Sequence, residues 1–272
     1  LPGLSEPVLR FSVFAGILLA MALIELAMPR RKLGAPKARR WLTNFSIVAI
    51  DTLIVRLMGM LAVPLVAVAA ALYARQQGWG LFNALGWPAW LEFILALLIL
   101  DLAIWFQHYV SHKVPLFWQL HQVHHADVDI DVSTAIRFHP IEIALSMLWK
   151  IALVFVFGPA AIAVVVFEVI LNGCALFNHA NIALPSWLDR LLRLVIVTPD
   201  MHRVHHSVIR CEHDSNCGFN LSVWDRLLGT YTAQPKKGHK GMTIGLGDYQ
   251  TSGPTRLFWS LALPFSSKSR RN

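Results

Sequence analysis

Cysteine and charge are both scarce in this chain. Only three cysteines occur among 272 residues, at Cys174, Cys211 and Cys217, and no CxxC pair is present. An odd number without paired spacing argues against a disulfide framework and against a cysteine-rich zinc site, so we interpret all three as free thiols. Charged residues make up 15% of the chain and hydrophobic residues 56%. This balance argues against an ordinary soluble domain.

Acidic residues are scarcer than basic ones. The chain has 16 Asp and Glu against 24 Lys and Arg, a net charge of +8 at pH 7. The basic residues stand beside long apolar runs, so we expect them to face anionic lipid, and we expect no nucleic-acid partner. The first apolar run has no basic segment before it and no small-residue cleavage site after it. It is therefore predicted to be a retained membrane span and not a signal peptide.

Several apolar runs reach the roughly 18 residues that indicate a membrane span. The second run contains Pro64, which predicts a kink near its middle, and the last two are separated by Gly158-Pro159, which predicts a helical hairpin. The fold class is therefore an all-α integral membrane protein with about four to five membrane helices, expected at 8–28, 46–74, 89–110, 141–157 and 160–177.

The loop between the first two spans contains six basic residues and no acid: Arg30, Arg31, Lys32, Lys37, Arg39 and Arg40. The positive-inside rule places this loop in the cytoplasm. Counting crossings then puts the polar stretches after the third span and after the hairpin on the same side. Segments 188–197 and 257–265 are expected to rest on the membrane as part of a cytoplasmic helical cap. We divide the chain into N-terminal membrane helices (1–94), a catalytic domain (95–231) and a C-terminal tail (232–272).

Ten of the twelve histidines form an ordered series. One pair is four residues apart, and the spacing HxxHH then occurs twice. On a helix these spacings place imidazoles on one face, and imidazole binds Fe, Zn, Cu and Ni. The number exceeds what one tetrahedral zinc ion uses, which favours a site for two metal ions. The series consists of His108, His112, His121, His124, His125, His139, His179, His202, His205 and His206.

Carboxylates and amides near these histidines are candidates for orienting them. Asp101 shares a helical face with His108, and Glu168 and Asn172 stand in the same relation to His179. An acid within a membrane span is costly and suggests function, although each could instead pair with a polar group on another helix. Glu142 follows His139 closely enough to hold it.

Two further acidic segments are interpreted more simply. Most of Asp127, Asp129 and Asp131 are expected in a solvated loop, with one of them available to support a ligand. Asp225 and Arg226 are interpreted as a structural ion pair in the cap.

The first pair and the two HxxHH groups form three histidine boxes: His108 and His112; His121, His124 and His125; and His202, His205 and His206. These boxes and their flanks resemble the fatty acid hydroxylase superfamily, also called the sterol desaturase family, and in particular its bacterial members. The resemblance covers about Leu95 to Tyr231. Its further matches are Phe138-His139-Pro140, Asn178-His179-Ala-Asn181, Asn216-Cys217-Gly218 and Trp224-Asp225-Arg226. The family commonly has Asn-Tyr-Gly where this chain has Cys217. Some members also have a second histidine shortly before the position of His179, and this chain has none there.

This resemblance implies an O2-dependent, non-haem di-iron oxidoreductase that hydroxylates or desaturates a C–H bond of a lipid or sterol-like substrate. The three boxes and His179 would bind two Fe²⁺ ions, with His139 as a further candidate and no catalytic residue beyond the metal site. The resemblance also implies the bacterial inner membrane, an active site on the cytoplasmic side and an external electron donor. The donor would be a separate ferredoxin- or cytochrome-type protein, because the chain shows no such domain.

Two other classes of protein fit a cluster of histidines. A zinc-dependent membrane hydrolase would use the metal to activate water, but the chain has no HExxH and no other obvious base motif. A metal transporter or a bis-histidine haem protein would place its ligands within the bilayer. Nearly all the histidines here are instead expected at or beyond the ends of the spans.

Overall fold

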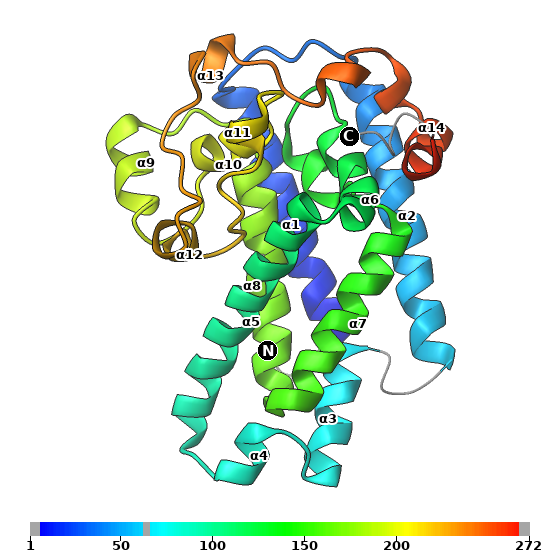
Figure 1. Cartoon of the computed structure of the whole chain (residues 1–272), viewed down its shortest axis with the longest axis vertical. Helices are drawn as coiled ribbons and strands as arrows, with labels where there is room; N and C mark the ends of the chain where they lie inside the picture. The colour runs from blue at the N-terminus through cyan, green and yellow to red at the C-terminus, as the bar shows by residue number, and fades with distance from the viewer. Residues whose placement is uncertain (1–5, 62–65, 267–272) are drawn as a thin grey trace.

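A computed structural model describes residues 6–61 and 66–266, and within these ranges it is helical and contains no strand. Five helices are long and apolar enough to cross a membrane. They stand side by side, and the shorter helices of the second half gather at one end of the bundle (Figure 1). This confirms the predicted all-α integral membrane fold. The five are α1 (Glu6–Ala27), α2 (Lys37–Leu61), α5 (Ala89–Lys113), α7 (Pro140–Phe157) and α8 (Ala161–His179).

The prediction of a single second span over 46–74 is wrong. Helix α2 begins at Lys37 and ends at Leu61, and a separate short helix, α3 (Ala67–Gln77), follows. The predicted kink at Pro64 lies outside the described residues. Helix α3 buries alanines against Met147, Ile151 and Val154 of α7. With 11 residues, α3 is too short to cross a bilayer on its own, so it serves as packing for the hairpin.

The predicted hairpin is present, and its turn is closely packed. Helix α7 ends at Phe157, and the next residue, Gly158, has φ +64° and caps the helix in the left-handed conformation. The turn meets Gly80, just before α4 (Leu81–Leu85), so closely that a Cβ on Gly80 would lie 2.3 Å from the Gly158 nitrogen. Glycine is required at both positions. The contact holds the end of the bundle opposite the histidines.

The other end of the bundle carries the cap. It contains α6 (Pro115–His125), the 3₁₀ helix η1 (Val132–Ile136) and a series of short helices (Figure 1). Trp187 on α9 (Ser186–Leu192) and Phe258 on α14 (Leu257–Ala262) are exposed, as helices that rest on a membrane require. The remaining short helices are α9 (Ser186–Leu192), α10 (Pro199–His205), α11 (Arg210–His213), α12 (Val223–Leu227), α13 (Gly238–Gly241) and α14 (Leu257–Ala262).

The acidic segment 127–131 does not form a solvated loop, which corrects that expectation. Arg40 is fully buried on α2, and its guanidinium donates two hydrogen bonds to Asp127 at 2.7 and 2.8 Å and one to Asp131 at 2.6 Å. Asp129 accepts from the backbone of Gly34 and Ala35, at 2.8 Å each. Burial alone would raise the pKa of Asp127, but Arg40 lowers it below its ordinary value. These contacts dock α2 and the loop before it onto the cap.

Candidate metal centre

Helix ends supply the histidines of all three boxes. The last two turns of α5 carry His108 and His112, and the single residue Val114 joins α5 to α6, where Pro115 starts the new helix. Helix α8 ends with His179. Helix α10 begins after Thr198, whose hydroxyl accepts from the Met201 amide, and delivers the third box. The local residues that start and end these helices therefore place the histidines of α5 and α6, α8 and α10 at one end of the bundle.

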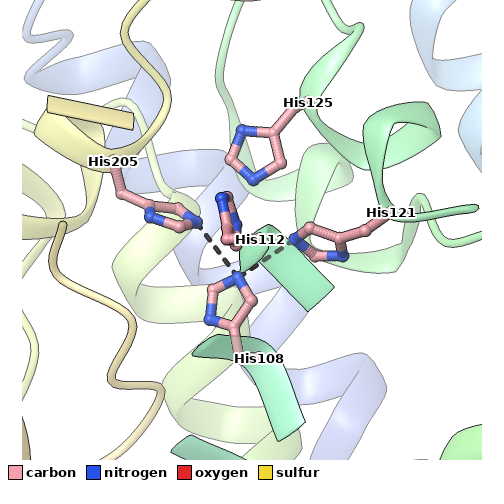
Figure 2. A group of neighbouring side chains, drawn as sticks. All are labelled: His108, His112, His121, His125 and His205. Carbon is pink, nitrogen blue, oxygen red and sulfur yellow. Dashed lines mark hydrogen bonds between the residues drawn. The ribbon is translucent and has the colours of Figure 1, made fainter. Parts of the chain in front are cut away.

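The histidines form two groups, and every member is buried. Within each group, one ring nitrogen per histidine lies within 4.8 Å of the others. Figure 2 shows the rings of the first group converging from α5, α6 and α10. The structure thus brings together nine of the ten predicted ligands. The first group is His108, His112, His121, His125 and His205, and the second is His124, His179, His202 and His206.

The Nδ1 atoms of several histidines donate to protein oxygens. His108 donates to the Cys217 carbonyl at 2.7 Å, His205 to the Ser215 carbonyl at 2.7 Å and His179 to the Ala175 carbonyl at 2.8 Å. His124 donates to the Arg137 carbonyl at 3.2 Å, and His121 to the Glu142 carboxylate at 2.6 Å. A carbonyl oxygen only accepts, so in the four rings that face one, Nδ1 carries the proton and Nε2 has a lone pair. An ionised Glu142 carboxylate would hold His121 in the same tautomer.

These Nε2 lone pairs face one another. The His108 Nε2 lies 3.0 Å from that of His121 and 3.1 Å from that of His205 (Figure 2). The His179 Nε2 is likewise 3.1 Å from that of His124 and 3.0 Å from that of His202. Two lone pairs this close repel unless a cation lies between them. The separations match those of ligands that each bind one metal ion at about 2.1 Å.

Burial completes a donor set for metal. It lowers the pKa of His124, His125 and His205 well below the ordinary value, which keeps the rings neutral near pH 7. Both ring nitrogens of His125 lack a hydrogen-bond partner among the described residues. Buried polar atoms of this kind call for an explanation, and metal binding supplies one. Both groups could therefore hold a metal ion.

The structure does not bring His139 to either group. Its Nδ1 accepts from the Ile141 amide at 3.2 Å and caps α7, and its Nε2 donates to the Leu261 carbonyl at 3.3 Å. Glu142 was expected to hold His139. Its carboxylate instead binds the ring of His121 at 2.6 Å, and its contact with His139 is to the backbone and not to the ring. His139 is thus a helix cap whose two ring nitrogens are used by the backbone.

The other expected supporting residues also lie away from the histidines. Asp101 accepts from the Trp224 indole at 2.7 Å. Glu168 accepts from Lys150 at 2.6 Å and from Arg10, and Asn172 donates to the Glu168 carbonyl. Of the four candidates, only Glu142 contacts a histidine of the two groups.

Asp225 does not pair with Arg226, which corrects another expectation. Its buried carboxylate accepts four hydrogen bonds: from the Trp105 indole, the Thr230 hydroxyl and the amides of Cys217 and Gly218. The guanidinium of Arg226 instead donates to the Arg193 carbonyl. Asp225 therefore fixes the loop whose Cys217 carbonyl orients His108.

His213 is a residue that the spacing argument missed. It is buried on α11, with its ring centroid 4.9 Å from that of His112 and 4.7 Å from that of His125. Its Nε2 has no hydrogen bond among the described residues. With His112 and Asp214 it forms a third group that could hold an ion. It belongs to no box, and its only signal is its place seven residues after His206.

The chain matches the family profile described as fatty acid hydroxylase over residues 93–230. It is 30% identical over 189 residues to the ornithine lipid hydroxylase OlsE of Rhizobium tropici, covering 68% of this chain and 54% of that protein. It is 28% identical over 181 residues to the human alkylglycerol monooxygenase, covering 64% of this chain and 38% of that protein. The chain therefore spans about half or less of the length of these relatives. No solved structure matches it.

Proposed function

Because the chain belongs to the fatty acid hydroxylase family, we propose that it is an O2-dependent membrane oxidoreductase that hydroxylates a C–H bond of a lipid. One observation carries the proposal: two buried groups of neutral imidazoles, with Nε2 lone pairs facing one another 3.0 to 3.1 Å apart. The names of the relatives support hydroxylation over desaturation, because both describe the insertion of oxygen into a lipid.

Each histidine group would hold one iron ion. Two Fe²⁺ ions bound there would supply the O2 activation that attack on an unactivated C–H bond requires. The protein's own part is orientation and exclusion of water. The Glu142 carboxylate and the Cys217 carbonyl hold His121 and His108 in the tautomer that presents Nε2, and Asp225 holds the loop behind Cys217. Asp214 Oδ1 lies 3.5 Å from His112 Nδ1, and neither atom has a hydrogen-bond partner among the described residues.

We further propose that electrons come from a separate ferredoxin- or cytochrome-type donor. The positive-inside argument supports a cytoplasmic active site in a bacterial inner membrane, since the loop before α2 and the histidine cap lie at the same end of the bundle (Figure 1). A donor in the cytoplasm could then reach the metal centre without crossing the bilayer.

The test is metal analysis and O2 uptake of the purified full chain, from cells grown without excess zinc. We expect about two iron ions per chain, reductant-dependent O2 uptake and a lipid product heavier by one oxygen atom. His205→Ala should lower bound metal and abolish turnover. His239→Ala is the matched control, because His239 is buried outside both groups. Zinc as the only bound metal, with no O2 uptake, would refute the proposal.

A further inference from the structure

The cap is basic where α11 comes to its surface. Arg210 on α11 and Lys113 at the end of α5 are exposed, and so are Lys236 and Lys237 in a later segment. The Lys236 amide donates to Glu212 of α11 at 2.6 Å, so this segment passes directly beside α11. These four cations form one surface, which we name the α11 patch.

Acidic side chains do not cancel the charge of the α11 patch. The Asp214 side chain is 16% exposed, and its single carboxylate pairs with both Lys113 at 3.0 Å and Arg210 at 3.1 Å. Among described residues 180–266, Asp248 is the only exposed acid. The patch therefore has a net positive charge, which attracts an acidic partner and raises its association rate.

The α11 patch faces water and not lipid. No large apolar side chain is exposed in the described segments 196–226 and 229–257, which contain α11 and α13. Exposed apolar side chains such as Trp187 and Phe258 lie instead on α9 and α14. Helices α11 and α13 stand toward the end of the molecule opposite α3 and α4 (Figure 1). This position favours a partner that arrives from the aqueous side.

The patch lies directly over the first histidine group. The Arg210 guanidinium donates to the His112 carbonyl at 3.3 Å and lies 5.5 Å from the centre of the Trp118 ring. The buried Trp118 ring has its centroid 5.3 Å from that of His112 and 5.6 Å from that of His125. The His213 ring is 4.6 Å from Trp118. One layer of aromatic side chains therefore separates the exposed surface from two histidines of the group.

The proposed hydroxylation draws its electrons from outside the chain. One atom of O2 enters the lipid and the other leaves as water, so each turnover consumes two electrons and two protons. A carrier that gives one electron must dock twice per turnover. Charge complementarity suits such a carrier, because it speeds docking without requiring slow release. Electron tunnelling also weakens steeply with distance, which favours docking where the cover over the histidines is thin.

We propose that the α11 patch is the docking surface of the electron donor, and that the donor is a small protein with carboxylates around its redox group. Electrons enter the first histidine group through Trp118 and His213. Each docking oxidises the carrier by one electron, which returns iron held by that group from Fe³⁺ to Fe²⁺. The electron transfer rests on the proposed function, but the docking does not.

The first test measures binding without turnover. The probe is an oxidised plant-type [2Fe–2S] ferredoxin, an acidic carrier, with the full chain in detergent and no lipid substrate. Its matched control is the same ferredoxin with its carboxylates converted to neutral amides and its visible spectrum unchanged. At about 0.05 M salt the native carrier should bind about tenfold more tightly, and this difference should vanish near 1 M salt, where the screening length is about 3 Å. No binding, or equal binding of both carriers at low salt, would overturn the proposal.

Charge reversals locate the docking surface. Lys236→Glu combined with Lys237→Glu should weaken ferredoxin binding about tenfold at low salt. The control is Arg190→Glu combined with Arg256→Glu, which makes the same charge change at exposed positions of α9 and just before α14. Equal weakening by both pairs would show that only net charge matters. Unchanged binding by the first pair would leave the patch to another occupant, such as anionic lipid. Either result would overturn the assignment.

A native cysteine reports docking directly. Cys211 is exposed on α11, next to Arg210. Native ferredoxin at ten times its Kd should slow maleimide labelling of Cys211 about tenfold by mass action, as measured by peptide mass. The neutralised carrier should not slow it. An unchanged labelling rate in the presence of bound ferredoxin would place the carrier elsewhere.

Electron entry is measured with active enzyme. The ratio of O2 uptake driven by ferredoxin to that driven by reduced methyl viologen, a small cation, should fall about tenfold in the Lys236 and Lys237 pair. It should also fall in Trp118→Leu at unchanged iron content, and an unchanged ratio there would overturn the entry route. If methyl viologen drives no O2 uptake in the native chain, the proposed function fails, whereas binding and labelling still decide the docking.

Discussion

Replacing Asp225 by asparagine tests whether a residue that binds no metal controls the metal centre. In the native protein Oδ1 accepts from Trp105, Cys217 and Thr230 at 2.9, 2.8 and 2.6 Å, and Oδ2 accepts from Gly218 at 2.9 Å. An asparagine has one acceptor oxygen, so its amide group would face a backbone N–H. One buried donor would lose its partner, and the remaining bonds would lose their charge. We estimate a cost of about 3 to 5 kcal/mol.

That cost falls on the loop that orients His108. If the Cys217 carbonyl moves, the His108 Nδ1 loses its acceptor at 2.7 Å, and metal affinity should fall about 10- to 100-fold. The assay is a chelator titration of the full chain, together with its melting temperature. Asp101→Asn is the control, because Asp101 is a buried acid on α5, the helix that carries His108. It accepts from Trp224 and Leu221 and not from residues 216–218. Equal metal retention by the two variants at equal loss of stability would refute the reasoning.

Three further predictions follow from single contacts. His213→Gln should weaken metal binding, because the His213 ring packs against His112 and His125. Metal content and the visible spectrum of the Co²⁺-substituted protein measure this effect. If both are unchanged, His213 only fills space. His139→Ala should leave metal content unchanged but cost about 1 kcal/mol of stability through loss of the α7 cap; loss of metal would reinstate it as a ligand. Asp127→Asn should cost about 1 to 3 kcal/mol, because Arg40 keeps its bond to Asp131 but loses the charged acceptor of two other hydrogen bonds. Because the folded pKa of Asp127 is lowered, its contribution is present above the unfolded carboxyl value near 4 and disappears as pH falls through the folded value. On the acid side of a plot of melting temperature against pH, the melting temperature should therefore fall less steeply in the variant than in the native protein. Equal slopes would contradict this.

Much of the histidine site could be predicted from helix periodicity alone. The spacings of His121, His124 and His125 depend only on local helix geometry, so their shared face could be predicted without the fold. His213 and the pairing of Glu142 with His121 depend on tertiary proximity, which no local pattern encodes. The expected link between Glu142 and His139 failed for this reason. Nearness in sequence did not correspond to contact between the side chains.

The membrane spans show the same limit. Hydropathy located α1, α5 and the hairpin, but it joined α2 and α3 into one span, because an apolar run does not show where a helix ends. The loop charges used for orientation are also partly engaged in protein contacts. Arg30 pairs with Asp200 at 2.9 Å, and Arg40 is buried against Asp127. A count of basic residues does not distinguish free charges from these.

Arg40 and Asp127 are separated by 87 residues, and this interval sets an order of events during synthesis. At about 5 to 20 residues per second, the arginine waits roughly 4 to 17 seconds for its acid. Until then its guanidinium is stable only in water or among lipid headgroups, so the first helical pair cannot seat fully. Its carboxylate partners, Asp127 and Asp131, are synthesised directly after the second histidine box. Arg40 thus makes the final packing of α2 depend on the segment that directly follows the second histidine box.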